Sequence, residues 1–136
     1  MSRVLGIDLG ASRVGLAVSD QSRTLASGYG FIQFKGYKEL IAMLLQIAEK
    51  ERIGEFVVGL PLNMNGSKGI QAAKSEKLVN LLREQTTIPV SVLDERLTTV
   101  EAARQIHASG QKVKKGRIDE VAATIIVQAF IDGKKH

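Results

Sequence analysis

The stretch RVLGIDLGASRVGLAVSD, residues 3–20, predicts two β-strands joined by a tight turn at Gly10-Ala11-Ser12. Side chains alternate along a strand, so Asp8 lies on the same side of the first strand as Gly6 and Gly10. Asp8 is the one carboxylate inside an otherwise apolar run. A charge on a central strand is costly to bury unless it is paired or binds a cation. Because the two glycines keep that side of the strand open, we expect Asp8 to face a cleft.

The length and composition are those of one soluble globular domain that covers residues 1–136. Hydrophobic residues make up 44% of the chain and charged residues 24%, which excludes a disordered tail. The sequence contains no run of about 18 apolar residues that would cross a membrane, and it begins without the pattern of a signal peptide. Cysteine is absent. We therefore expect a cytoplasmic protein that does not associate with membranes.

Beyond the hairpin, segments of helical periodicity alternate with extended segments. The predicted elements are a strand at 24–34, a helix at 37–52 ended by Gly54, a buried strand at 55–60, a helix after the turn at 63–67, a strand at 88–93, a helix at 98–108, a basic loop at 111–117 and a helix at 118–132. This order predicts an α/β fold with a mixed five-stranded sheet. A three-stranded antiparallel meander is continued by parallel strands, and helices cover the faces of the sheet.

Three carboxylates from distant parts of the chain are predicted to meet at one edge of this sheet. Asp8 lies at the carboxyl end of the first strand, where ligands gather in α/β sheets, and Glu95 follows the end of the 88–93 strand. Asp119 lies on the face of the last helix that packs toward the sheet. Carboxylates this close repel one another unless a cation lies among them. Their hard oxygen atoms suit Mg²⁺ or Mn²⁺, which support phosphodiester hydrolysis by activating a water and stabilising the departing oxygen.

Four blocks of the sequence, in order, resemble the YqgF (RuvX) family of the ribonuclease H-like superfamily. They are GIDLGASRVGLAVSD, VVGLPLNMNGSKG, DERLTT at 94–99 and KKGRIDEVAATIIVQAFID. The resemblance implies a ribonuclease H-like fold and a divalent-metal nuclease that processes the 5′ end of pre-16S rRNA; members were earlier proposed to be Holliday-junction resolvases. The acidic residues of the family correspond to Asp8, Glu95 and Asp119, as catalytic residues and metal ligands. Asn65 stands where the family usually has Asp, which argues against a metal role for that loop.

Each of these acids also has a simpler interpretation, which the sequence leaves open. Glu95 could belong to a solvated loop with an ion pair, and Asp94 could exchange roles with it. Asp119 could be an acid that stabilises the N-terminus of a helix. Asp20 fits a turn residue better than a metal ligand.

The formal charge of +5 predicts attraction to polyanions. Aromatic residues make up only 4% of the chain, so recognition through the nucleic-acid backbone and shape fits better than base stacking. The loop at 111–117 is expected to be a mobile arm that follows the backbone. For Lys68, a solvated surface position is the simpler alternative. The cations predicted to contact phosphates are Arg13, Lys68, Arg96, Lys114, Lys115 and Arg117.

Three functional hypotheses follow. The first is a metal-dependent nuclease that acts on structured RNA or branched DNA as a monomer or weak homodimer. The second is a non-catalytic nucleic-acid-binding module that uses the same basic face. The third is an ATPase of the sugar-kinase or actin type, because Asp8, Gly10 and Gly15 resemble its first phosphate motif; 136 residues leave no room for the second domain of such enzymes. The nuclease is the function that we expect.

Overall fold

A five-stranded sheet forms the middle layer of the computed structural model, which describes residues 2–108 and 115–133. The strands lie in the order β3-β2-β1-β4-β5. The first three form an antiparallel meander, and β4 and β5 run parallel to β1. The mixed sheet that the sequence predicts is therefore confirmed. The strands are β1 Arg3–Leu9, β2 Arg13–Ser19, β3 Ala26–Gln33, β4 Ile53–Leu60 and β5 Val90–Asp94.

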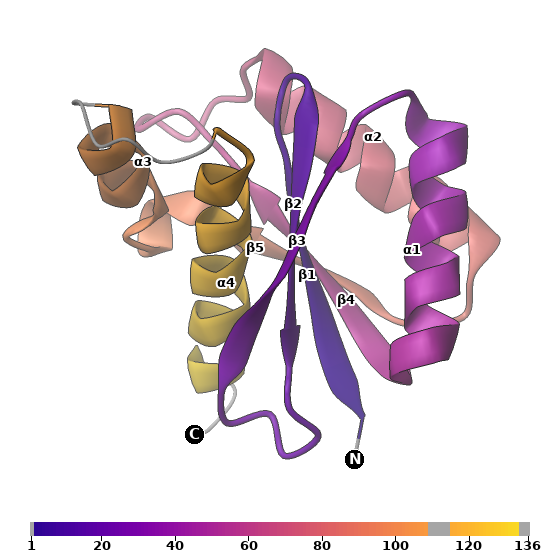
Figure 1. Cartoon of the computed structure of the whole chain (residues 1–136). Helices are drawn as coiled ribbons and strands as arrows, with labels where there is room; N and C mark the ends of the chain where they lie inside the picture. Colours follow the sequence, from indigo (N-terminus) through magenta and orange to yellow (C-terminus); the bar gives the residue numbers. More distant parts are fainter. Residues whose placement is uncertain (1, 109–114, 134–136) are drawn as a thin grey trace.

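Helices cover both faces of the sheet (Figure 1). α1 and α2 lie on one side, α4 lies on the other, and α3 packs beside α4. In the described part of the chain, no helix has both the length and the hydropathy to cross a membrane. The helices are α1 Tyr37–Glu51, α2 Ile70–Gln85, α3 Val100–Ala108 and α4 Lys115–Gly133, with a short 3₁₀ helix, η1, at Glu95–Leu97.

Strand β1 is buried on both faces, because a helical layer lies on each side of it. Leu5 and Ile7 belong to the core shared with α1 and α2, and Val4 belongs to the core shared with α4. Alternation along the strand places Asp8 on the same side as Val4. The one carboxylate of β1 therefore faces the α4 layer.

Helix α4 approaches the β1–β2 hairpin closely, because glycines face it. A Cβ atom at Gly15 would lie 1.9 Å from the carbonyl oxygen of Asp119, and one at Gly6 would lie 2.1 Å from the Val127 side chain. Gly15 is the partner of Asp8 across the two strands. The absence of a side chain at Gly15 therefore lets α4 bring Asp119 beside the buried carboxylate of β1.

Two predicted boundaries are wrong. Helix α1 is ended by Arg52, whose backbone is left-handed with φ of 55°, and Gly54 lies inside β4, where a Cβ atom would clash with Ser2. The last helix begins at Lys115 instead of 118, so Arg117 is helical and does not belong to a loop. Lysine and arginine are good helix formers, which explains the longer helix. The rest of the predicted basic loop, with Lys114, lies outside the described residues.

Replacing Gly15 with alanine is expected to lower the free energy of unfolding by about 1–3 kcal/mol, because the added methyl group must push the backbone of α4 away from the sheet. Gly133→Ala, at the end of α4, is the control for the glycine-to-alanine change, since a Cβ atom there meets no described atom within 4 Å. Urea denaturation of both variants measures the effect. Equal unfolding midpoints for the two variants would contradict the close contact.

Candidate active site

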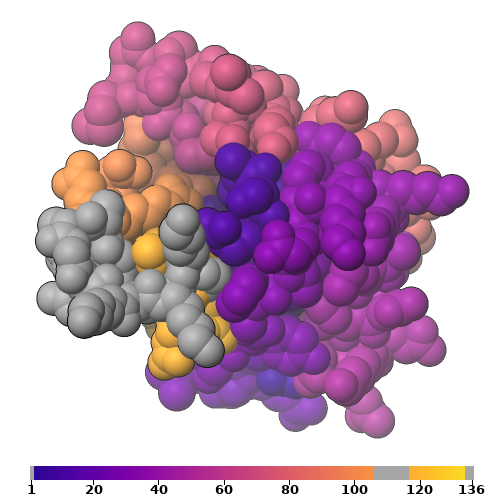
Figure 2. Space-filling model, turned by 45° about the horizontal axis from the view of Figure 1, so that its top comes forward, coloured from indigo at the N-terminus to yellow at the C-terminus, as the bar shows by residue number. Residues whose placement is uncertain are grey.

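Asp8, Glu95 and Asp119 lie at the end of the sheet where the parallel strands finish. Asp8 is the last residue but one of β1, Glu95 follows β5 directly, and Asp119 lies near the start of α4. Figure 2 looks onto this end, where the indigo β1–β2 turn, the orange α3 and the pink segment leading into α2 lie next to one another. An acidic pocket of about 270 Å³ opens here, lined by Asp8, Leu9, Gly10, Ala11, Pro61, Gln71, Arg104 and Asp119.

Arg104 of α3 holds two of the acids together. Its Nη2 donates to Asp8 Oδ1 at 2.6 Å, and its Nη1 donates to Glu95 Oε1 at 2.8 Å. The side chains of Asp8 and Glu95 are only 3% and 6% exposed, whereas that of Arg104 is 30% exposed. One guanidinium group therefore compensates two buried carboxylates, which would otherwise repel each other.

Asp119 binds a different arginine. Arg13 Nε donates to Asp119 Oδ2 at 3.0 Å, and the Asp119 side chain is 16% exposed. Among the residues that the structure describes, no three acidic or histidine side chains lie close enough together to hold one metal ion. The structure thus brings Asp8 and Glu95 together around Arg104, and it places Asp119, which pairs with Arg13, in the wall of the acidic pocket that Asp8 also lines.

Burial disfavours the charged form of both acids that contact Arg104. It raises the pKa of Asp8, although Arg104 opposes the shift, and Asp119 raises it further. Burial likewise raises the pKa of Glu95 from 4.5 to about 6, with Arg104 lowering it and Asp8 raising it. Arg104 therefore offsets the cost of burying these two carboxylates only in part.

The turn after β5 decides which acid of the Asp94-Glu95 pair points inward. Asp94 Oδ1 accepts a hydrogen bond from the Arg96 backbone N–H at 2.9 Å, and its carboxylate also binds the Arg96 guanidinium, which lowers the pKa of Asp94. Glu95 points to the other side and becomes buried. A Cβ atom at Gly59 would lie 2.6 Å from Glu95 Oε2, so this glycine makes room for the inward carboxylate.

The acidic residues have the chemistry to bind a divalent cation. Glu95 Oε2 is buried and has no hydrogen-bond partner among the described residues. The same holds, within the described chain, for Oε1 of Gln71, which lines the acidic pocket. Unpartnered buried oxygens cost free energy, and carboxylate and amide oxygens are the ligands that Mg²⁺ and Mn²⁺ prefer. The residues present therefore fit such an ion.

The predicted phosphate-binding cations are mostly engaged with acids. Arg13 binds Asp119, Arg96 binds Asp94, and Lys68 pairs with Glu76 of α2. Arg117 is exposed on α4. Lys114 and the side chain of Lys115 lie outside the described residues.

Two other polar residues behave as turn residues. Asp20 accepts hydrogen bonds from the backbone N–H groups of Thr24 and Leu25 in the β2–β3 connection, at the opposite end of the sheet from Asp8. The interpretation of Asp20 as a turn residue is therefore supported. Asn65 Oδ1 accepts hydrogen bonds from the backbone N–H and the hydroxyl of Ser67, within the loop before α2.

Two residues of the site, Arg104 and Gln71, were not predicted from the sequence. Arg104 lies one helical turn after Val100, which is completely buried, so the two share the inward face of α3. A cation on the buried face of a helix indicates an acidic partner in the interior, and this was the available signal. Gln71 had no such signal, because a glutamine in the first turn of a helix is common.

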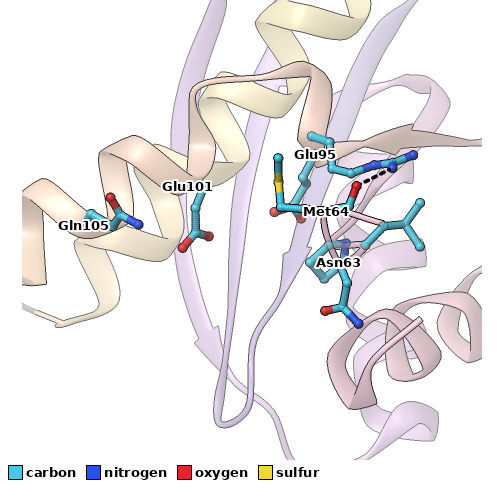
Figure 3. A pocket seen from close by; sticks show the side chains of 8 residues that line it. Asn63, Met64, Glu95, Glu101 and Gln105 are labelled. Carbon is cyan, nitrogen blue, oxygen red and sulfur yellow. Dashed lines mark hydrogen bonds between the residues drawn. The ribbon is translucent and has the colours of Figure 1, made fainter. Parts of the chain in front are cut away.

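A second cavity lies next to the acidic pocket, since Pro61 lines both. We call it the side pocket; it has a volume of about 500 Å³. Figure 3 shows Glu101 and Gln105 of α3 standing opposite Met64 and Asn63 of the loop after β4. Met64 is 88% exposed. The side pocket is lined by Pro61, Leu62, Asn63, Met64, Glu95, Arg96, Glu101 and Gln105.

Known proteins resemble this sequence along almost its whole length. A family model described as RuvX, Holliday junction resolvase, matches residues 2–133. A relative from Caldanaerobacter subterraneus subsp. tengcongensis, provisionally named pre-16S rRNA nuclease, is 43% identical and covers 98% of this chain and 99% of its own. A relative from Syntrophomonas wolfei subsp. wolfei with the same provisional name is 38% identical, and the match covers 96% of this chain and 94% of the relative.

Solved structures resemble the fold. RuvC of T. thermophilus in complex with a Holliday junction substrate matches with a TM-score of 0.59 at 15% identity, covering 99% of this chain and 97% of that chain. The Holliday junction resolvase of fowlpox virus matches with a TM-score of 0.58 at 12% identity, covering 96% and 99%. At such identities the likeness shows the fold alone. The ribonuclease H-like fold predicted from the sequence is thereby confirmed.

The pKa of Glu95 leads to a pH dependence of stability. Because its pKa in the folded protein, about 6, exceeds the ordinary value of 4.5, Glu95 contributes stability below pH 4.5 and loses that contribution as the pH rises through 6. Relative to Glu95→Gln, the metal-free parent is expected to lose about 2 kcal/mol of unfolding free energy across this range. Urea unfolding of both proteins in EDTA at several pH values checks this. A difference that does not change with pH would contradict the pKa shift.

Proposed function

The chain belongs to the RuvX family, and from this membership we propose that it is a nuclease that depends on Mg²⁺ or Mn²⁺ and processes the 5′ end of pre-16S rRNA. The names of its relatives support nuclease activity and give the precursor of 16S rRNA as the substrate. The relatives also match this chain from end to end, so the proposal concerns the whole domain.

The placement of Asp8, Glu95 and Asp119 at one end of the sheet is the observation that most supports metal dependence. Two of these carboxylates are buried and share the guanidinium of Arg104, and an oxygen of Glu95 has no hydrogen-bond partner among the described residues. We assign the three carboxylates as the groups that would hold the divalent ions. When bound, ions of this kind activate a water and neutralise the oxygen that departs from phosphorus.

The protein's own side chains and backbone would hold the metal ligands in place and bind the substrate. Strand β1 is fixed between two helical layers, so Asp8 is held in one position. Arg13 pairs with Asp119 of the acidic pocket, and Arg96 lines the side pocket, so each pocket has a guanidinium group beside it or in its wall. In our proposal these two arginines bind the phosphates that flank the scissile bond, since guanidinium groups match phosphate geometry. The acidic pocket and the side pocket together receive the nucleic-acid backbone.

A four-way DNA junction is the second candidate substrate, because the matching family model is described as a Holliday junction resolvase. Both substrates present a phosphodiester within a folded nucleic acid. Recognition through phosphates and shape, which the low aromatic content favours, does not separate them.

Replacing Asp8 or Asp119 with asparagine is expected to lower the cleavage rate on the order of 100-fold or more, because an amide keeps the shape of the side chain and removes the charge that attracts the metal. Asp20→Asn is the matched control. Asp20 lies at the far end of the sheet and its amide can still accept the turn hydrogen bonds, so the rate should stay at the parental value. Cleavage of a labelled substrate in Mn²⁺ measures all three variants. Parental activity in Asp8→Asn would rule out the assigned site.

The substrate is tested by offering labelled pre-16S rRNA 5′ ends and four-way junctions in parallel, each with Mg²⁺, Mn²⁺ or EDTA. We expect cleavage of the rRNA precursor with either metal and none in EDTA. Cleavage of the junction alone would establish the resolvase instead. Binding of both substrates with a steep salt dependence and no cleavage would identify a non-catalytic binding module.

A further inference from the structure

Arg104 occupies the position between Asp8 and Glu95 where a cation is needed. Its two terminal nitrogens lie 2.6 Å from Asp8 Oδ1 and 2.8 Å from Glu95 Oε1. Both carboxylates are almost completely buried, and an uncompensated buried charge is strongly destabilising. The Arg104 guanidinium thus supplies positive charge at the position where a metal ion would supply it.

The guanidinium compensates this pair of acids incompletely. It carries one positive charge against two negative charges, and it leaves Glu95 Oε2 without a partner among the described residues. A divalent oxygen-seeking ion would neutralise both carboxylates. The buried pair therefore favours a divalent ion over the arginine whenever such an ion is available.

Arg104 is also the member of this cluster that can leave. Its side chain is 30% exposed, while the side chains of the two acids are only 3% and 6% exposed. Asp8 belongs to the central strand β1, and Glu95 belongs to the turn that follows β5. A third acid, Glu101, lies near Arg104 but outside this buried pair. Its side chain is 74% exposed, and its Oε2 lies 3.9 Å from Arg104 Nη1. A small rotation of the arginine side chain therefore exchanges buried acids for an exposed one.

We propose that Arg104 is a built-in counter-ion that the divalent metal displaces, so that guanidinium and metal occupy the Asp8–Glu95 pair in turn. This inference rests on the proposed metal-dependent function. Arg104 acts as a positioning residue: it keeps the two carboxylates side by side before the metal arrives, and its displacement lowers the apparent metal affinity. Metal binding and release of the Arg104 side chain are one coupled step.

Isothermal titration of Mg²⁺ and Mn²⁺ into the full-length protein tests the competition. Arg104→Gln is expected to bind metal about 10-fold more tightly than the parent, which corresponds to about 1.4 kcal/mol. The metal-free variant should melt at a lower temperature than the parent, and saturating Mg²⁺ should remove most of that difference. Arg104→Lys keeps the charge and cannot bridge both acids, so its affinity should fall between the two.

Arg96→Gln is the control for the general effect of removing a positive charge near the site. Arg96 lies in the turn beside Glu95 and binds Asp94, but it contacts neither Asp8 nor Glu95 in the described structure. Its metal affinity should stay within about twofold of the parent. Equal affinities for the parent and Arg104→Gln would overturn the proposal. So would equal gains in Arg96→Gln and Arg104→Gln.

Nuclear magnetic resonance of ¹⁵N-labelled arginine side chains in the parent protein observes the release directly. In the metal-free protein the Nη hydrogens of Arg104 should give separate signals, because two ion pairs restrict rotation of the group. These signals should merge as Mg²⁺ is added. Separate signals that persist at saturating Mg²⁺ would overturn the displacement while leaving the nuclease intact. If neither the parent nor Arg104→Gln bound Mg²⁺ or Mn²⁺, the metal-dependent nuclease itself would be rejected, and this inference with it.

Discussion

The functional end of the molecule has to keep two carboxylates, those of Asp8 and Glu95, buried side by side. Asp8 is the last residue but one of the central strand β1, Glu95 follows β5 at the edge of the sheet, and both side chains are almost completely buried. Such a pair stays charged only if a cation is held against it. The position of α3 follows from this requirement, since it is the element that carries Arg104 to the pair.

The sheet supplies the geometry and small residues supply the space. Parallel strands β1, β4 and β5 finish at the same edge, which brings segments from distant parts of the chain together. Gly15 leaves room for the backbone of α4 at Asp119, and Gly59 leaves room for the carboxylate of Glu95. A larger residue at either position would fill space that the site needs. These two glycines have no side chain to pack, and the space this leaves is taken by polar groups.

The order of elements, the mixed sheet and the side of β1 that Asp8 occupies could all be predicted, because they depend on periodicity and on the alternation of side chains. The common edge of the three acids followed from where parallel strands end. The ion pairs could not be predicted in the same way. Arg104 is 96 residues from Asp8 and Arg13 is 106 residues from Asp119, and a local pattern says nothing of such partners. The αL residue Arg52 was missed because glycine at 54 offered the more usual end for a helix.

The contact between α4 and the hairpin has a consequence for biosynthesis. The hairpin is complete within the first 19 residues, yet the layer that covers its Asp8 side comes from the last helix. A chain translated only as far as α3 therefore holds Asp8 and Glu95 without Asp119, and the apolar surface on the Asp8 side of the hairpin lacks the helix that covers it in the folded protein. The site that we propose can form only after α4 has been translated, so a protein that trims ribosomal RNA in the way we propose would stay inert until then.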